Sequence, residues 1–136
     1  MLGNIEMVKL LLVAGACTEV YDEDNCTPLL ITVYTDRIDI MKTLIDFGAD
    51  VNKQNSHKYT ALHHAAWNGR REMVQFLLEC SAQDNDPTDD GNTPLALAAH
   101  GGHYCILEML INRGCCVNNS DKLVLIQSYF IYFYYG

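Results

Sequence analysis

Apolar residues recur along this chain in steps of three and four, and the whole pattern recurs every 33 residues. One column of the pattern consists of leucine alone: Leu11, Leu44, Leu77 and Leu110. Within one period, apolar residues such as those at 73, 74, 77 and 78 fall on one face of a helix. The pattern therefore predicts a stack of equivalent helical units, an architecture that usually provides a binding surface.

Threonine and glycine mark where the helices of each unit begin and end. Thr27 and Thr93 each precede a proline, and Thr60 stands at the same position. A threonine hydroxyl caps a helix, and proline is tolerated at its first position because that amide would be unpaired anyway. The second helix is expected to end at a glycine in the left-handed conformation. That column is Gly15, Gly48 and Gly114, with Ser81 as the exception.

These residues resemble the ankyrin repeat family. Its Thr-Pro-Leu-His motif is matched at 27–29, 60–63 and 93–95, its Gly-Ala-Asp-Val-Asn ending at 48–52, and its Gly-His turn at 102–103. The resemblance implies an all-α repeat solenoid of helix-turn-helix repeats with protruding β-hairpin fingers. It also implies that His63 ties its repeat to the next. Leu30 and Ala96 replace this histidine elsewhere, so we expect looser junctions there.

The repeat register divides the chain. We expect one repeat domain at 1–121, with a partial repeat at 1–21 and full repeats at 22–54, 55–87 and 88–120. The partial repeat lacks its first helix, which should leave apolar side chains such as Leu10 and Leu11 partly uncovered. Neither end has a recognisable polar cap, so self-association through the uncapped ends or the tail is a further expectation. The chain is interpreted as a piece or alternative product of a longer repeat protein.

The segment 122–136 is apolar and aromatic and does not continue the repeat. It is too short for a membrane span, which needs about 20 apolar residues. Three alternatives remain: a sequence never selected for this fold, a packed cap over the last repeat, and membrane contact. Its composition is also that of an aggregation-prone strand.

Composition narrows the function classes. The chain has 9 basic and 17 acidic residues and a net charge of −8, which argues against nucleic acid as a partner. The first residues lack the basic region of a secretory signal, so we expect a cytoplasmic location, with the nucleus as an alternative. The six cysteines are scattered over repeat positions without a Cys-x-x-Cys pair, which favours free thiols over a disulfide or zinc site.

No pattern of catalytic residues stands out. His63 and His64 near Cys80 could suggest a nucleophile pair, but the resemblance gives His63 a structural role. There is no glycine-rich phosphate loop or paired catalytic carboxylate. We therefore expect a protein that is not an enzyme and has no cofactor, no metal site and no catalytic residues.

The resemblance implies that finger tips and first helices line a concave groove, which makes them the predicted partner-binding surface. Tyr34, Trp67 and His100 stand 33 residues apart at the end of the first helices, and large aromatic side chains are common interface anchors. Packing against adjacent repeats alone is the alternative for Tyr34 and Trp67. The other predicted partner-binding residues are Thr35, Asn68, Tyr59, His57, Glu23, Asp24, Asp89 and Asp90. With Lys53, His57 and Lys58 in the central finger, the charge pattern predicts a partner whose basic patches flank an acidic or neutral centre.

Two function classes follow. The first is a protein–protein interaction module, an adaptor or scaffold whose partner is a protein. The alternative is a regulatory or substrate-recruiting repeat segment of a larger multidomain enzyme, such as a ubiquitin ligase or kinase.

The resemblance also implies a modification site. Leu44 followed by Asp50, Val51 and Asn52 resembles a substrate of an asparagine hydroxylase. Asn52 is therefore a candidate for hydroxylation, ahead of Asn118.

Overall fold

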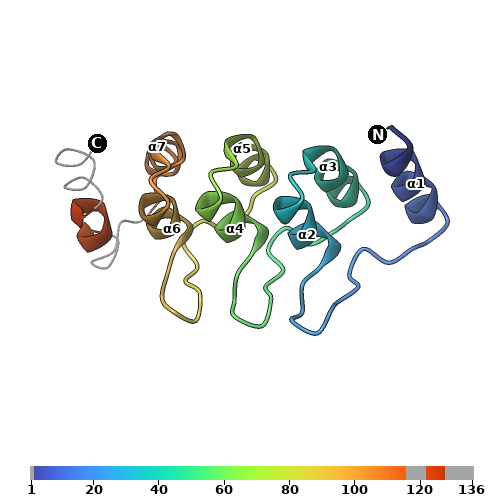
Figure 1. The fold of residues 1–136 in the computed structure, drawn as a ribbon, viewed down its shortest axis with the longest axis horizontal. Coiled ribbons are helices and arrows are strands. Elements are labelled where there is room, and N and C mark those ends of the chain that lie inside the picture. The colour runs from blue at the N-terminus through green and yellow to red at the C-terminus, as the bar shows by residue number, and fades with distance from the viewer. Residues whose placement is uncertain (1, 116–121, 128–136) are drawn as a thin grey trace.

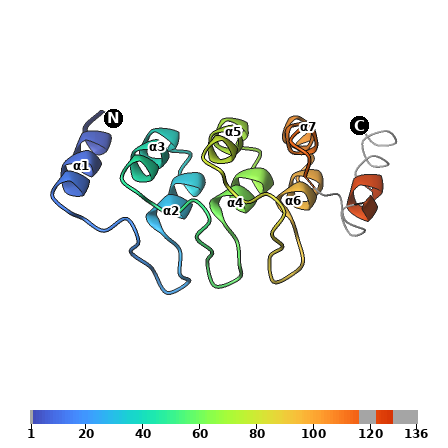
Figure 2. The ribbon, with the colours of Figure 1, turned by 180° about the vertical axis from the view of Figure 1, so that it is seen from behind.

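The computed structural model describes residues 2–115 and 122–127, and in this part of the chain the helices form two parallel rows (Figure 1). One row contains the first helix of each pair, and the other contains the second helices together with α1. The first helices are α2 (Pro28–Tyr34), α4 (Ala61–Trp67) and α6 (Pro94–His100). The second row contains α1 (Leu2–Val13), α3 (Ile38–Asp46), α5 (Arg71–Glu79) and α7 (Tyr104–Asn112). The view from behind shows the same two rows, with every finger on the side of the first helices (Figure 2).

Threonine caps begin each first helix, as predicted. The Thr27 and Thr93 hydroxyls accept hydrogen bonds from the amides of Leu30 and Ala96, and each is followed by proline at the first helical position. Thr60 caps α4 without a following proline, and there the cap is reciprocal. The His63 amide donates to the Thr60 hydroxyl, and Nδ1 of His63 accepts from the Thr60 amide at 3.2 Å. A histidine side chain therefore performs the role that Glu or Gln usually has in such a cap.

The backbone repeats even where the residue type does not. Gly15, Gly48 and Gly114 have φ values of 92°, 91° and 84°, which confirms the predicted left-handed turns. Ser81 replaces glycine in this column and still has a φ of 64°. This conformation is unfavourable for a residue with a Cβ atom. The packing of the repeats, rather than the residue type, therefore determines the backbone conformation of Ser81.

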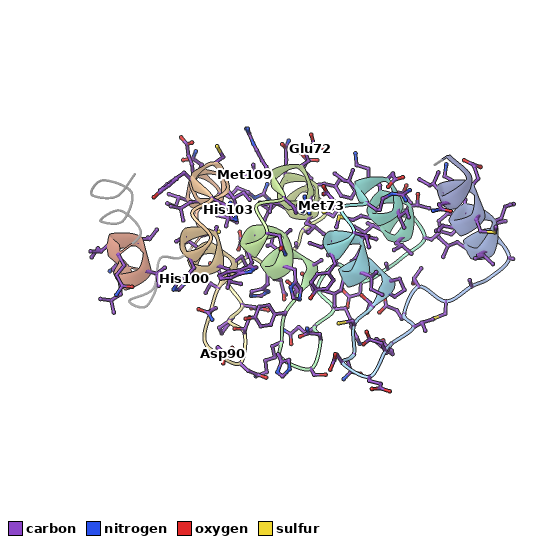
Figure 3. The ribbon with its side chains drawn as sticks, viewed as in Figure 1. Glu72, Met73, Asp90, His100, His103 and Met109 are labelled. Carbon is purple, nitrogen blue, oxygen red and sulfur yellow. The ribbon has the colours of Figure 1, made fainter. Side chains whose placement is uncertain are left out.

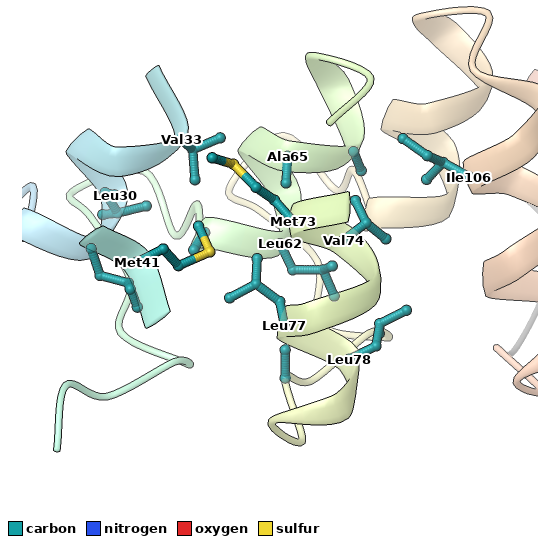
Figure 4. Packing of buried hydrophobic residues seen from close by; sticks show 14 of the residues in the cluster. Leu30, Val33, Met41, Leu62, Ala65, Met73, Val74, Leu77, Leu78 and Ile106 are labelled. Atoms are coloured by element: carbon teal, nitrogen blue, oxygen red, sulfur yellow. The ribbon is translucent and has the colours of Figure 1, made fainter. Parts of the chain in front are cut away.

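The core runs along the stack as one continuous cluster between the two rows (Figure 4). Met41, Leu62, Met73 and Leu77 are among its largest fully buried side chains. Small residues such as Ala65 are also completely buried, and they allow α4 to pack closely between α2 and α6. Each unit thus buries its apolar face only against its neighbours, which is how repeat proteins are stabilised.

The fingers are tight hairpin turns. In each finger one backbone hydrogen bond joins the outer residues, from the amide to the carbonyl oxygen in the pairs Asp22–Cys26, Asn55–Tyr59 and Thr88–Asn92. A second bond closes the turn inside it, from the amide to the carbonyl oxygen in the pairs Asn25–Asp22, Lys58–Asn55 and Gly91–Thr88. No residue in the described ranges is in a β-strand, so these hairpins are shorter than the β-hairpins expected from the resemblance. A single ladder bond per finger leaves too few paired residues for a strand.

The two ends of the described chain expose apolar side chains. Helix α1 packs against α3, and Met7, Leu10, Leu11 and Val13 of α1 are each more than half exposed. At the other end, residues 122–127 form a short helix in which Leu123 is 64% exposed. The rest of the predicted tail, 128–136, lies outside the described residues. In the described part of the chain, no helix is long and apolar enough to cross a membrane.

Candidate protein-binding surface

The predicted anchors Tyr34, Trp67 and His100 are the last residues of α2, α4 and α6. Because these helices have equal length and lie side by side, the three side chains form one column across the stack. Tyr34 is 52% exposed and Trp67 is 50% exposed, and His100 is also exposed. We call this column, together with the fingers 22–26, 55–59 and 88–92, the finger face. Figure 3 shows His100 on α6 and Asp90 at the tip of the neighbouring finger.

Tyr34 is half exposed because its other half packs on the next repeat. Its hydroxyl lies 2.9 Å from Nε2 of His64 in α4. The Tyr59 ring, from the central finger, stacks on the same imidazole with ring centroids 5.0 Å apart and planes at 28°. Tyr34 and Tyr59 therefore belong to one aromatic cluster that joins two repeats and a finger. Its central member, His64, was not among the predicted binding residues.

The chemistry of His64 is set by burial. Removal from solvent, and then the neighbouring His63, lower the pKa of His64 to about 4. The imidazole is consequently neutral at pH 7 and can accept or donate one hydrogen bond with the Tyr34 hydroxyl. The sequence contains an indication of this contact, because His64 stands 30 residues after Tyr34 and the register places its helix beside α2.

His63, in contrast, has the structural role that the resemblance implied. It is fully buried, and its Nε2–H donates to the carbonyl oxygen of Asp86 at 2.9 Å, in the segment that leads to the next finger. Burial lowers the pKa of His63 as well.

Another histidine, His103, fixes the end of α4, because its Nε2–H donates to the Trp67 carbonyl oxygen at 2.9 Å. A Cβ atom added to Gly101 would come within 2.6 Å of the His103 ring, so this position requires glycine.

Both lysines of the predicted charge pattern have partners within the protein. Lys58 forms an ion pair with Asp89 of the next finger at 3.2 Å. The Lys53 ammonium lies 5.1 Å from the centroid of the Tyr21 ring. The positive charges of Lys53 and Lys58 are therefore engaged within the protein. Asp22 is also used internally, because its Oδ1 accepts from the amides of Asp24 and Cys26.

Neighbouring fingers are joined through their backbones. The amide and hydroxyl of Ser56 both donate to the Asp24 carbonyl oxygen, at 3.0 and 2.8 Å. The Asp89 amide donates to the carbonyl oxygen of His57 at 3.2 Å. Both contacts link one tip to the next, so the central finger fixes the positions of the acidic first and last fingers relative to each other.

Three of the predicted contact residues use their polar groups locally. The Thr35 hydroxyl donates to the Ile31 carbonyl, the Asn68 amide to the His64 carbonyl, and Nδ1 of His100 to the Ala96 carbonyl. A partner would have to compete with these bonds. The exposed Glu23 and Asp90 carboxylates have no partner among the described residues.

The remaining candidate residues lie apart from the finger face or are unsuited to catalysis. Burial raises the pKa of the Cys80 thiol, which disfavours the thiolate that a nucleophile requires. Asn52 lies in the segment between α3 and the central finger, and its side-chain oxygen accepts from the Gln83 backbone amide at 2.8 Å. No group of three or more metal-ligating side chains occurs within the described residues.

A cleft of about 380 Å³ opens between α3 and α5, and the residues that line it include Asp36 and Arg70.

Stacked helix pairs with hairpin fingers and an exposed aromatic column define an α-helical repeat protein whose surface is built for binding. The family models for ankyrin repeats match residues 1–89, with three copies, and 90–122. The chain therefore belongs to the ankyrin repeat family. Such repeats are non-catalytic modules that bind protein partners, and this chain is a protein-interaction module of that kind.

The comparison with characterised sequences agrees. A probable E3 ubiquitin-protein ligase from Oryza sativa subsp. japonica is 35% identical over 82% of this chain and 22% of its own length. Protein fem-1 homolog A-like from Mus musculus is 37% identical over 70% of the chain and 14% of its own length. A putative ankyrin repeat-containing protein from Treponema pallidum is 31% identical over 90% of the chain and 42% of its own length. The chain thus spans less than half of each relative.

Proposed function

We propose that this chain acts as an adaptor or scaffold that binds a protein partner through the finger face, with Trp67 as the central anchor. The observation that carries the proposal is the exposure of Trp67, which is 50% exposed at the end of a helix whose other side is buried. A rigidly held aromatic side chain binds with a small loss of conformational entropy. Tyr34 and Tyr59 extend the same surface, because both contact His64.

A pull-down from cytosol with wild-type chain and the Trp67→Ala variant tests this proposal. Loss of a buried aromatic anchor should weaken binding by about 2 kcal/mol or more. Phe47→Ala is the matched control, because Phe47 is a 44% exposed aromatic residue at the end of α3, in the other row. Equal capture by all three folded proteins would contradict a site on the finger face.

We propose as a second candidate that the chain is the recruiting or regulatory repeat segment of a larger enzyme. Its support is that a relative named as a ubiquitin-protein ligase matches this chain over only 22% of its own length. The sequence of the parent transcript on either side distinguishes the two candidates: a ligase or kinase domain there favours the second, and further repeats alone favour the first.

We also propose that the chain self-associates through α1. Four large apolar side chains of this helix are more than half exposed: Met7, Leu10, Leu11 and Val13. Charge repulsion between two copies of α1 should be small, because Glu6 and Lys9 of this helix form an ion pair with each other at 3.4 Å.

A cytoplasmic location, with the nucleus as the alternative, is a further proposal. Its support is that Cys17, Cys26, Cys80 and Cys105 are not joined in disulfides, which is usual in a reducing compartment. Microscopy of a fluorescent fusion tests it, and a signal confined to secretory compartments would contradict it.

A further inference from the structure

The exposed ends of the first helices are aromatic and carry no ionic charge of their own. Helices α2, α4 and α6 contain no Lys, Arg, Asp or Glu, and Tyr34 and Trp67 at their ends are half exposed. The face of an aromatic ring is negatively polarised and attracts cations. The surface is therefore chemically suited to a cationic side chain as well as to an apolar one.

The fingers beside these helices are acidic. They carry five carboxylates and one ammonium group: Asp22, Glu23, Asp24, Asp89 and Asp90 against Lys58. Lys58 is already paired with Asp89, and Asp22 is engaged by backbone amides of its own turn. Glu23, Asp24 and Asp90 keep side chains that form no ion pair with the described residues. The finger face thus has negative charge that is uncompensated within the described protein.

The two histidines beneath the column, His63 and His64, do not supply the missing positive charge at neutral pH. His63 and His64 lie beneath the aromatic residues, and burial lowers the pKa of both, that of His64 to about 4. The Tyr34–His64–Tyr59 cluster is consequently uncharged at pH 7. This cluster therefore adds no positive charge against the negative potential of the fingers.

We propose that the occupant of the finger face is a basic protein segment, in which an arginine stacks on Trp67 while neighbouring basic residues face Glu23 and Asp24 on one side and Asp90 on the other. The proposal rests on the proposed function and names the chemistry of its partner. Arginine fits better than lysine because its planar guanidinium can stack on an indole ring and also pair with a carboxylate.

The acidic positions are arranged in advance for such a segment. Ser56 holds the first and central fingers together through the Asp24 carbonyl, and the Asp89 amide holds the central and last fingers together. Binding therefore requires little ordering of the fingers, which lowers its entropic cost. Because the ion pairs would be exposed, affinity should fall as salt concentration rises.

Trp67 is the single tryptophan of the chain, so its fluorescence reports directly on occupation of this surface. The probes are short peptides in which arginine, glutamine or glutamate alternates with alanine, titrated into the whole chain at low and at physiological salt. We expect the arginine peptide to change the Trp67 emission saturably and more weakly at higher salt, and the other two to cause no saturable change. Equal or tighter binding of the glutamine or glutamate peptide would overturn the proposal.

Two triple variants separate the finger face from the net charge of −8. Glu23→Gln/Asp24→Asn/Asp90→Asn should weaken binding of the arginine peptide about tenfold. Asp46→Asn/Glu79→Gln/Glu108→Gln changes the net charge equally, but at exposed positions of α3, α5 and α7, and should leave the affinity within about twofold of wild type. Equal weakening by both would show attraction to net charge alone and overturn the proposal.

The outcomes for the two proposals can be told apart. If the arginine peptide fails to bind while a captured partner still depends on Trp67, the basic partner is refuted and the finger face stands as a binding site. If capture of the partner does not depend on Trp67, the proposed function itself fails. Calorimetry measures the affinity of the arginine peptide for Trp67→Ala, which lacks the fluorescent residue. We expect this variant to lose binding, as we expect weaker binding by Glu23→Gln/Asp24→Asn/Asp90→Asn.

Discussion

The Tyr34 hydroxyl lies 2.9 Å from Nε2 of His64, a contact that joins α2 to α4 across the boundary between two repeats. Tyr59 stacks on the same ring. The imidazole thus packs against two aromatic side chains, in accord with burial as the largest cause of its lowered pKa.

This contact predicts a pH dependence of stability. The pKa of His64 is about 4 in the folded protein and close to 6.5 when unfolded. The unfolded chain therefore binds more protons between these values, so stability is greatest above pH 6.5 and falls as the pH is lowered towards 4. His63 acts in the same direction. We expect the Tm to fall between pH 7 and pH 5.

The His64→Gln variant should show a smaller decrease in Tm over this range, because glutamine does not titrate. His57→Gln, on an exposed finger tip, is the control and should keep the wild-type slope. Thermal unfolding followed by circular dichroism measures both. The same slope in wild type and His64→Gln would show that His64 is not buried as described.

A second prediction concerns the turn after α5. Ser81 has a φ of 64° where the equivalent residues are glycine, and the left-handed conformation costs a residue with a Cβ atom about 1 kcal/mol. Ser81→Gly should remove this cost and raise the Tm by a few degrees. Ser81→Ala retains the Cβ atom and should give no increase. An equal gain from both variants would mean that the serine hydroxyl, rather than the backbone, causes the strain.

Much of the fold follows from local chemistry that the sequence displays. Thr27 and Thr93 predict where two helices begin, because a capping hydroxyl binds an amide of the turn that follows it. Gly48 predicts a turn in the same local way, because it adopts the left-handed conformation. The column of Tyr34, Trp67 and His100 follows from the period alone. These features do not depend on knowing how the repeats pack.

The contacts between repeats could not be read in the same way. The pairing of Lys58 with Asp89 depends on how far adjacent fingers are displaced, and the order of charges along the sequence did not indicate it. His64 was overlooked because its role depends on the reach of a tyrosine from another helix. Lateral packing sets these relationships, and the 33-residue period does not specify it.

A third prediction concerns modification of Asn52. Its side-chain oxygen accepts a hydrogen bond from the Gln83 backbone amide at 2.8 Å, while its backbone amide donates to the Asp50 carboxylate at 2.9 Å. An asparagine hydroxylase acting on this chain should add oxygen at Asn52 in preference to Asn118, which lies outside the described residues. Peptide mass spectrometry after incubation with the enzyme measures both sites. The absence of oxygen addition at Asn52 would remove it as a candidate.

The last prediction concerns the exposed face of α1. Leu10 and Met7 are 68% and 61% exposed, and burying two such side chains in a contact between copies is favourable by about 1.5–3 kcal/mol for each. If this face mediates self-association, Met7→Lys/Leu10→Lys should shift the protein towards monomer in sedimentation equilibrium. The substitution also adds positive charge to a chain of net charge −8, which by itself would reduce repulsion between copies.

The charge effect and the apolar effect therefore act in opposite directions, which makes the result decisive. Phe47→Lys/Ile111→Lys is the matched control, because both residues are exposed apolar side chains on other helices, at 44% and 43%, and receive the same added charge. Dissociation of the α1 variant but not of the control would support association through α1. Dissociation of both to the same extent would point to general apolar attraction, and a wild-type protein that is already monomeric would end the self-association proposal.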